Sequence, residues 1–112
     1  MTKVRLITHK DADGGGTLVT LWGDGVVDLD NVSVTPLDGR VLVKIRGVNW
    51  PFRDPMLQVG TAEVQRIRTG HHSKAEGNEL WIVFDLAGSG VEVKEVGPDP
   101  TKPNNVLVRL AR

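Results

Sequence analysis

Cysteine is absent from this sequence of 112 residues. The absence excludes disulfide bonds, a cysteine-ligated zinc site and a thiol nucleophile. It leaves the compartment open, because many domains that work outside the cytoplasm have no cysteine either.

The chain also lacks an excess of either charge, with 14 basic and 14 acidic residues. A protein that binds duplex nucleic acid usually carries a basic excess, since phosphate contacts supply most of its affinity. Only a local basic patch could serve that purpose here, so we expect no nucleic-acid partner.

Long apolar runs are missing too. No stretch approaches the roughly 20 apolar residues of a membrane span, so we expect none in this chain. The residues after Met1 alternate in character and form no apolar core of a signal peptide. If the protein works outside the cytoplasm, we therefore expect this chain to be an excised domain or a mature fragment.

No segment shows the pattern of an amphipathic helix of three turns. The 13 glycines and six prolines are more than a helical bundle would contain. The length fits a single domain over residues 1–112, and 39% apolar content is enough for a core. The sequence thus predicts one all-β domain without cofactor.

Apolar and polar residues alternate with the period of a β-strand along most of the chain. Asp24-Gly25 and Asp38-Gly39 are typical of tight hairpin turns. A loop with two prolines at 49–55 suggests a boundary between two halves, and the mixed parity of 56–68 predicts a β-bulge or a short helical turn. Polar residues at 11–16 and 98–105 indicate loops, the second expected to be mobile. A first strand is predicted to begin at Val4 and to break at Asp11. Further strands are predicted at 17–22, 26–29, 32–34, 40–46, 80–86, 91–93 and 106–110.

The two strongest predicted strands look like copies of one another. Residues 40–47 align with residues 81–88 at a constant offset of 41 (88 minus 47), and each copy ends in glycine. The inward positions correspond, as Val41 with Ile82 and Val43 with Phe84. A true repeat would predict a β-sandwich of two small, pseudo-symmetric antiparallel sheets packed face to face.

These copies resemble the recurring element of the AMIN domain, a strand with arginine, three mostly apolar residues, aspartate, leucine and a nearby glycine. The first copy keeps Arg40 but has Lys44 at the aspartate position, and the second keeps Asp85-Leu86 but has Trp81 at the arginine position. Two stretches are similar to the form of the domain found before secretin pores: Ile67 to Gly70 with the two following histidines, and Gly23 to Val26. The resemblance spans residues 4–110, and the order of its parts is its strongest feature.

The resemblance implies a non-catalytic β-sandwich that binds peptidoglycan in the periplasm and localises an attached protein. It implies a type IV pilus secretin as the parent protein, or else an N-acetylmuramoyl-L-alanine amidase. The departures at Lys44 and Trp81 leave the ligand surface open. The alternative is a protein–protein adaptor that docks an envelope partner through a sheet edge or outer face.

Arginine side chains are suited to the carboxylates of the peptide stems, because guanidinium binds carboxylate in bidentate fashion. An equally simple interpretation is a ladder of cross-strand ion pairs on an outer sheet face. Trp81 is predicted to lie on an outer face as a possible sugar-stacking platform, Trp22 in the core, and Trp50 in a loop. The candidate binding residues are Arg40, Arg66, Arg68, His71, His72, Trp81 and Asp85.

Other chemistry has little support in the sequence. His71 and His72 are adjacent, so on a strand they face opposite sides and cannot readily chelate one metal ion. The serines lack the glycine-rich setting of a nucleophile, and Asp28 and Asp30 indicate a solvated face. We therefore expect neither a metal site nor an enzyme.

Overall fold

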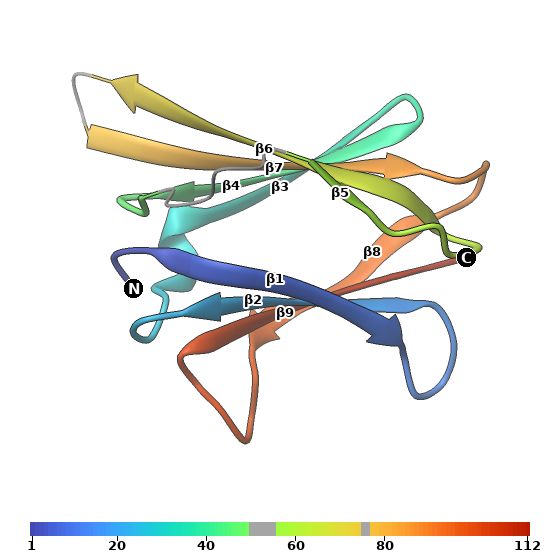
Figure 1. The fold of residues 1–112 in the computed structure, drawn as a ribbon, viewed down its shortest axis with the longest axis horizontal. Coiled ribbons are helices and arrows are strands. Elements are labelled where there is room, and N and C mark those ends of the chain that lie inside the picture. The colour runs from blue at the N-terminus through green and yellow to red at the C-terminus, as the bar shows by residue number, and fades with distance from the viewer. Residues whose placement is uncertain (50–55, 75–76) are drawn as a thin grey trace.

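The computed structural model describes residues 1–49, 56–74 and 77–112, and these residues form an all-β sandwich of two antiparallel sheets (Figure 1). This confirms the fold class predicted from the sequence. Among the described residues, no helix is long and apolar enough to cross a membrane. One sheet has the order β1 (Val4–Asp11), β2 (Thr17–Gly23), β9 (Asn105–Ala111), β8 (Glu92–Pro98); the other has the order β3 (Val32–Leu37), β4 (Arg40–Arg46), β7 (Gly77–Leu86), β6 (Val64–Lys74), β5 (Met56–Gln58).

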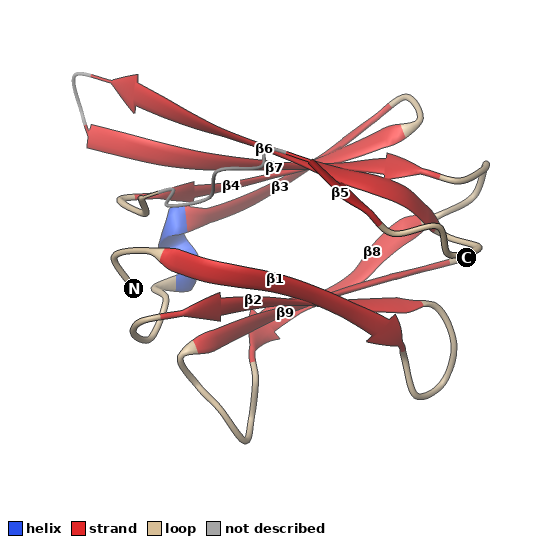
Figure 2. Ribbon diagram, in the orientation of Figure 1, coloured by secondary structure: helices blue, strands red, loops and turns tan. Residues whose placement is uncertain are grey.

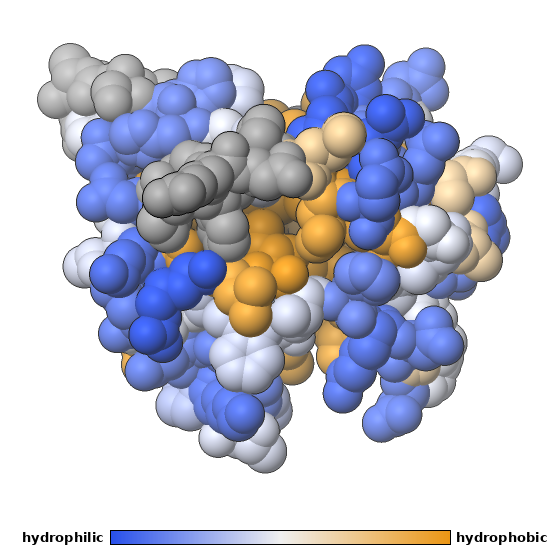
Figure 3. All heavy atoms as spheres, viewed as in Figure 1, coloured by the Kyte–Doolittle hydropathy of each residue, from blue (hydrophilic) through white to orange (hydrophobic). Residues whose placement is uncertain are grey.

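One face of each sheet lies against the other and forms a shared core. The alternating residues predicted to point inward are buried, including Val41, Val43 and Ile45 on β4 and Ile82 and Phe84 on β7. Figure 3 shows apolar side chains between the two layers and hydrophilic ones over the outer parts. Full burial of a side chain such as Phe84 stabilises the fold by about 1.5–3 kcal/mol. Burial of the apolar side chains therefore fixes which face of each strand lies in the core and which face is exposed to ligands.

The two repeated strands are neighbours in a single sheet. Strand β4 pairs antiparallel with β7, and Arg40 lies opposite Asp85 while Lys44 lies opposite Trp81. The repeat therefore does not assign one copy to each sheet, although the sandwich itself is present with sheets of four and five strands. The predicted boundary at 49–55 falls almost wholly outside the described residues.

The predicted strand at 26–29 is wrong. Residues 26–28 are not in a strand, and a short 3-10 helix, η1 (Leu29–Asn31), follows them (Figure 2). The hairpin expected at Asp24-Gly25 is absent because the Asp24 carboxylate accepts hydrogen bonds from the side chain and backbone of Thr2 and the backbone of Lys3. These bonds, led by the one from the Thr2 hydroxyl, hold the pKa of Asp24 well below its usual range. Asp24 thus fastens the start of the chain instead of forming a hairpin turn.

Trp22 lies on the outer face of the four-stranded sheet, so its predicted place in the core is wrong. Thr17, Val19 and Leu21 take the inward positions of β2, and Trp22 is half-buried on the other side. The sequence misleads here because the odd-numbered and the even-numbered residues of this strand are both largely apolar.

The bulge predicted in 56–68 is confirmed as a register shift between Val64 and Arg66.

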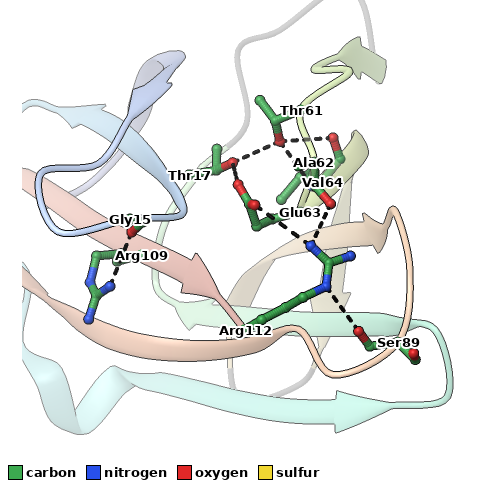
Figure 4. A network of polar contacts seen from close by, with 9 residues as sticks. All are labelled: Gly15, Thr17, Thr61, Ala62, Glu63, Val64, Ser89, Arg109 and Arg112. Carbon is green, nitrogen blue, oxygen red and sulfur yellow. Dashed lines mark hydrogen bonds and ion pairs between the residues drawn. The ribbon is translucent and has the colours of Figure 1, made fainter.

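A polar network ties the two sheets together at one end of the sandwich (Figure 4). The fully buried hydroxyl of Thr17 on β2 lies 2.8 Å from Glu63 Oε1 and 2.7 Å from Thr61 Oγ1, both in the β5–β6 turn. Arg112 donates to the carbonyl oxygens of Ala62 (2.9 Å) and Ser89 (3.2 Å). A hydroxyl has one proton, so Thr17 donates to the Glu63 carboxylate and accepts from Thr61.

Replacing Thr17 by valine should destabilise the fold by about 1–2 kcal/mol, because the substitution keeps the shape but removes a buried donor to a carboxylate. Urea denaturation measures this loss. The matched control is Thr20→Val, the same change on the outer face of the same strand, which should alter stability far less. Equal effects of the two changes would contradict a stabilising role for the network.

Candidate functional site

Six of the seven predicted binding residues lie together on the outer face of the five-stranded sheet. Strand pairing places Arg40, Asp85 and Arg66 side by side across β4, β7 and β6. The inward neighbours Val41, Phe84 and Ile67 are buried in the core, which fixes the opposite orientation of the candidates. The remaining members of this group are Arg68, His72 and Trp81.

Asp85 is the centre of the cluster. It accepts two parallel hydrogen bonds from Arg68, at 2.8 Å from Nε and 2.9 Å from Nη2. Arg66 Nε lies 3.2 Å from the same carboxylate. The hydrogen bonds from Arg68 to Asp85 raise the pKa of the Arg68 guanidinium. One carboxylate, its side chain 15% exposed, therefore orients the guanidinium groups of two arginines whose side chains are 37% and 45% exposed.

The cluster has more cationic groups than its one carboxylate can satisfy. Arg66 Nε is buried and lacks a hydrogen-bond partner, because its contact with Asp85 has the distance of an ion pair but not the alignment of a hydrogen bond. Arg40 is exposed opposite Asp85, and no hydrogen bond or ion pair links it to another described residue. The group carries a net charge of +2, three guanidiniums against one carboxylate. It borders an open depression of about 390 Å³ lined by Gly39, Arg40, Gln65, Arg66, Arg68, Asp85 and Leu86.

Trp81 is on the outer face, as predicted, but its ring is already in contact with other side chains. The His72 ring stacks on it at 3.8 Å between centroids, and Lys44 Nζ lies 4.3 Å from the ring centroid. Its Nε1 donates to Glu79 Oε1 at 2.5 Å. A sugar ring could stack on this indole only by displacing one of these neighbours. Trp81 is therefore better placed to hold the side chains of His72, Lys44 and Glu79 in position on this face than to bind a sugar directly.

His71 is the one candidate that the structure separates from the others. It lies opposite Leu80, which is fully buried, so His71 is on the face of β6 that is directed toward the core. Its side chain is nevertheless exposed, and in Figure 1 the β6–β7 hairpin extends beyond the lower sheet. Among the described residues, no three His, Cys, Asp or Glu side chains lie close enough together to hold a metal ion.

Neither Lys44 nor Glu79 was among the candidate residues predicted from the sequence. The alternation of residues 40–46 predicts that Lys44 points outward with Arg40, but its contact with Trp81 follows from the register of β4 against β7. Glu79 is buried and accepts from Trp81, one outward position away on the same strand. If the antiparallel pairing of the two repeated strands had been inferred, it would have predicted the contact between Lys44 and Trp81.

Comparisons with known proteins identify no relative: no family model, no curated protein and no solved structure matches the chain. The resemblance to the AMIN domain therefore remains a prediction that rests on the residues quoted above.

A double-mutant cycle on Arg68 and Asp85 should give a coupling free energy of about 0.5–1 kcal/mol, since the pair is bidentate but partly exposed. The variants are Arg68→Ala, Asp85→Ala and the double change, measured by urea denaturation. The coupling should shrink when the salt concentration is raised, because salt screens exposed charges. A coupling of zero at low salt would show that Asp85 does not hold Arg68 in place.

Proposed function

We propose that this chain is a non-catalytic, AMIN-like module that binds peptidoglycan through the arginine cluster of the five-stranded sheet. The observation that supports this most directly is the excess of guanidinium groups around Asp85, with Arg40 exposed opposite this carboxylate and not paired with any described residue. Such an arrangement holds cationic donors in fixed positions while leaving them able to bind a further anion.

Peptidoglycan carries such anions on its peptide stems, which end in or bear carboxylates. Arg40 and Arg66 have guanidinium N–H groups that can donate to a ligand. A guanidinium group binds a carboxylate with two parallel hydrogen bonds, whereas the ammonium group of lysine acts as a point charge. Asp85 can also accept a hydrogen bond from a sugar hydroxyl or an amide. The depression is open and shallow, which suits a long polymer better than a small molecule that must be enclosed.

The place of this module in the cell is part of the proposal. The motif order resembles the AMIN domain of envelope proteins, so we place the chain in the periplasm, attached to a larger protein. The stretch from Ile67 to Gly70 favours a type IV pilus secretin over a peptidoglycan amidase as that protein. The role is then to localise the parent protein at the cell wall.

The first test is co-sedimentation of the purified chain with protein-free peptidoglycan sacculi at low and moderate salt. The wild-type chain should pellet, and soluble wall fragments should compete with the sacculi. Changing Arg66 and Arg68 together to alanine should weaken binding at least about tenfold, the loss expected for one or two charge-assisted hydrogen bonds.

The matched control changes Lys3, just before β1, and Lys94, on β8, to alanine, which removes two positive charges outside the arginine cluster. This control should pellet like the wild type. Equal weakening of both double variants would indicate non-specific attraction between charges. A wild-type chain that stays in the supernatant at both salt concentrations would overturn the proposal.

One observation favours the adaptor as the second candidate function. The edge strand β3 exposes Val34 (39%) and Leu37 (50%). Together with Val91 and Val93 they border a largely apolar groove of about 340 Å³ between the edges of the two sheets. A protein partner could add a strand at this edge, although Pro36 deprives β3 of one backbone donor. An adaptor should ignore sacculi and bind a defined envelope protein with saturable affinity.

A further inference from the structure

A second polar depression lies on the outer face of the four-stranded sheet, around Trp22. The indole Nε1 donates to Thr8 Oγ1 on the neighbouring strand β1 at 2.9 Å, which fixes the plane of the ring. Lys102 Nζ from the β8–β9 loop lies 4.9 Å from the ring centroid. Trp22 thus stands at the sheet surface beneath a loop that contributes a cation.

Hydrogen bonds within this loop give it a defined conformation. Asp99 Oδ1 accepts from the Thr101 backbone (2.9 Å) and hydroxyl (3.0 Å), and these bonds lower the pKa of Asp99. Asn105 is buried beside Trp22, and its backbone N–H donates to the Lys102 carbonyl at 2.8 Å. The loop is therefore already shaped before any ligand arrives.

Trp22 borders two adjoining depressions, of about 280 and 380 Å³. Both are also lined by Lys102 and Asn105. The first adds the hydroxyls of Thr8, Thr20 and Thr101, and the second adds the Asn104 side chain and Arg5. An aromatic ring among hydroxyl and amide groups is the combination that recognises a sugar, whose C–H face is apolar and whose edge carries hydroxyls.

The charges around Trp22 select an acidic ligand. Lys102, Lys10 and Arg5 are cationic, and within the described chain neither Lys10 nor Arg5 has a hydrogen-bonded or ion-paired side chain. Asp99 is the one carboxylate among the described residues that line these depressions; it accepts hydrogen bonds from Thr101 and attracts the charge of Lys102. A ligand with its own carboxylate would give Lys10 and Arg5 the anionic partner that the described residues do not supply, and it would compete with Asp99 for Lys102.

We propose that Trp22 and Lys102 form a second binding site, specific for a pyranose that carries a carboxylate. Lys102 Nζ, which lies over the indole in the free chain, moves aside to bind the carboxylate of the sugar. The apolar face of the sugar then takes its place against the ring, and the hydroxyls of Thr8, Thr20 and Thr101 bind its polar edge. This site shares no residue with the arginine cluster and lies on the opposite sheet. A chain with both sites could hold two separate saccharide segments at once.

The test is an NMR titration of the ¹⁵N-labelled chain with three sugars: N-acetylmuramic acid, glucuronic acid and N-acetylglucosamine. The first and third differ only in the lactyl ether at O3, which carries the carboxylate. N-acetylmuramic acid should shift the Trp22 indole N–H and the backbone amides of residues 101–105, and it should bind about tenfold more tightly than N-acetylglucosamine, as expected for one charge-assisted hydrogen bond. Glucuronic acid shows whether the site accepts any carboxylated sugar. If it binds as tightly as N-acetylmuramic acid, the site is specific for carboxylated sugars in general. If it binds more weakly, the site is specific for sugars with the lactyl ether of muramic acid.

The variant Lys102→Met keeps most of the unbranched side chain, one heavy atom shorter, and removes its charge. It should abolish the preference for N-acetylmuramic acid, whereas the matched variant Lys94→Met on the same sheet should retain it. Absence of shifts at Trp22 with both acidic sugars, or an unchanged preference in Lys102→Met, would overturn the second site. Because pelleting with sacculi is assigned to Arg66 and Arg68, a chain that pellets normally but shows no shift at Trp22 overturns this inference alone.

Discussion

The inner strands of both sheets, β2 and β9 in one and β4, β7 and β6 in the other, give one of their two faces to the same core, and the rest of the structure depends on this constraint. The inward side chains of both sheets are almost all aliphatic, with Phe84 the largest that is fully buried. A shift of one residue in any register would exchange core and surface side chains along that strand, so the pairing is strongly specified. The outer face of each sheet is then free to carry polar chemistry without loss of core packing.

The two outer faces use this freedom differently. On the five-stranded sheet, Asp85 fixes the positions of Arg66 and Arg68, and the stacked Trp81 and His72 adjoin them on the same two strands. An exposed ion pair contributes little to stability, so the value of this cluster is its fixed geometry. On the four-stranded sheet, Trp22 is anchored to Thr8 and covered by the Lys102 loop. Both arrangements suit a sugar polymer that bears carboxylates, the first through its charge and the second through its aromatic surface.

Much of the fold followed from the sequence, and so did much of the site. Strict alternation at Val41, Val43 and Ile45 predicted both a strand and its buried face, and it placed Arg40 outward. Where both parities of a strand are apolar, as around Trp22, alternation cannot distinguish the two faces, and the prediction was wrong. Asp24 was misinterpreted because its hydrogen bonds reach Thr2 and Lys3, more than 20 positions away in the chain. The contact of Lys44 with Trp81 depends on which strands pair and in what register. The alternation of residues along a single strand does not predict either.

The central claim is that the arginine cluster of the five-stranded sheet is the surface that contacts the cell wall. Mapping backbone amide shifts of the labelled chain against soluble peptidoglycan fragments that retain their peptide stems tests it most directly. The account predicts shifts concentrated at Arg66, Arg68 and Asp85 on β6 and β7. Shifts confined to residues 32–37 of β3, or no shifts at any amide, would contradict it.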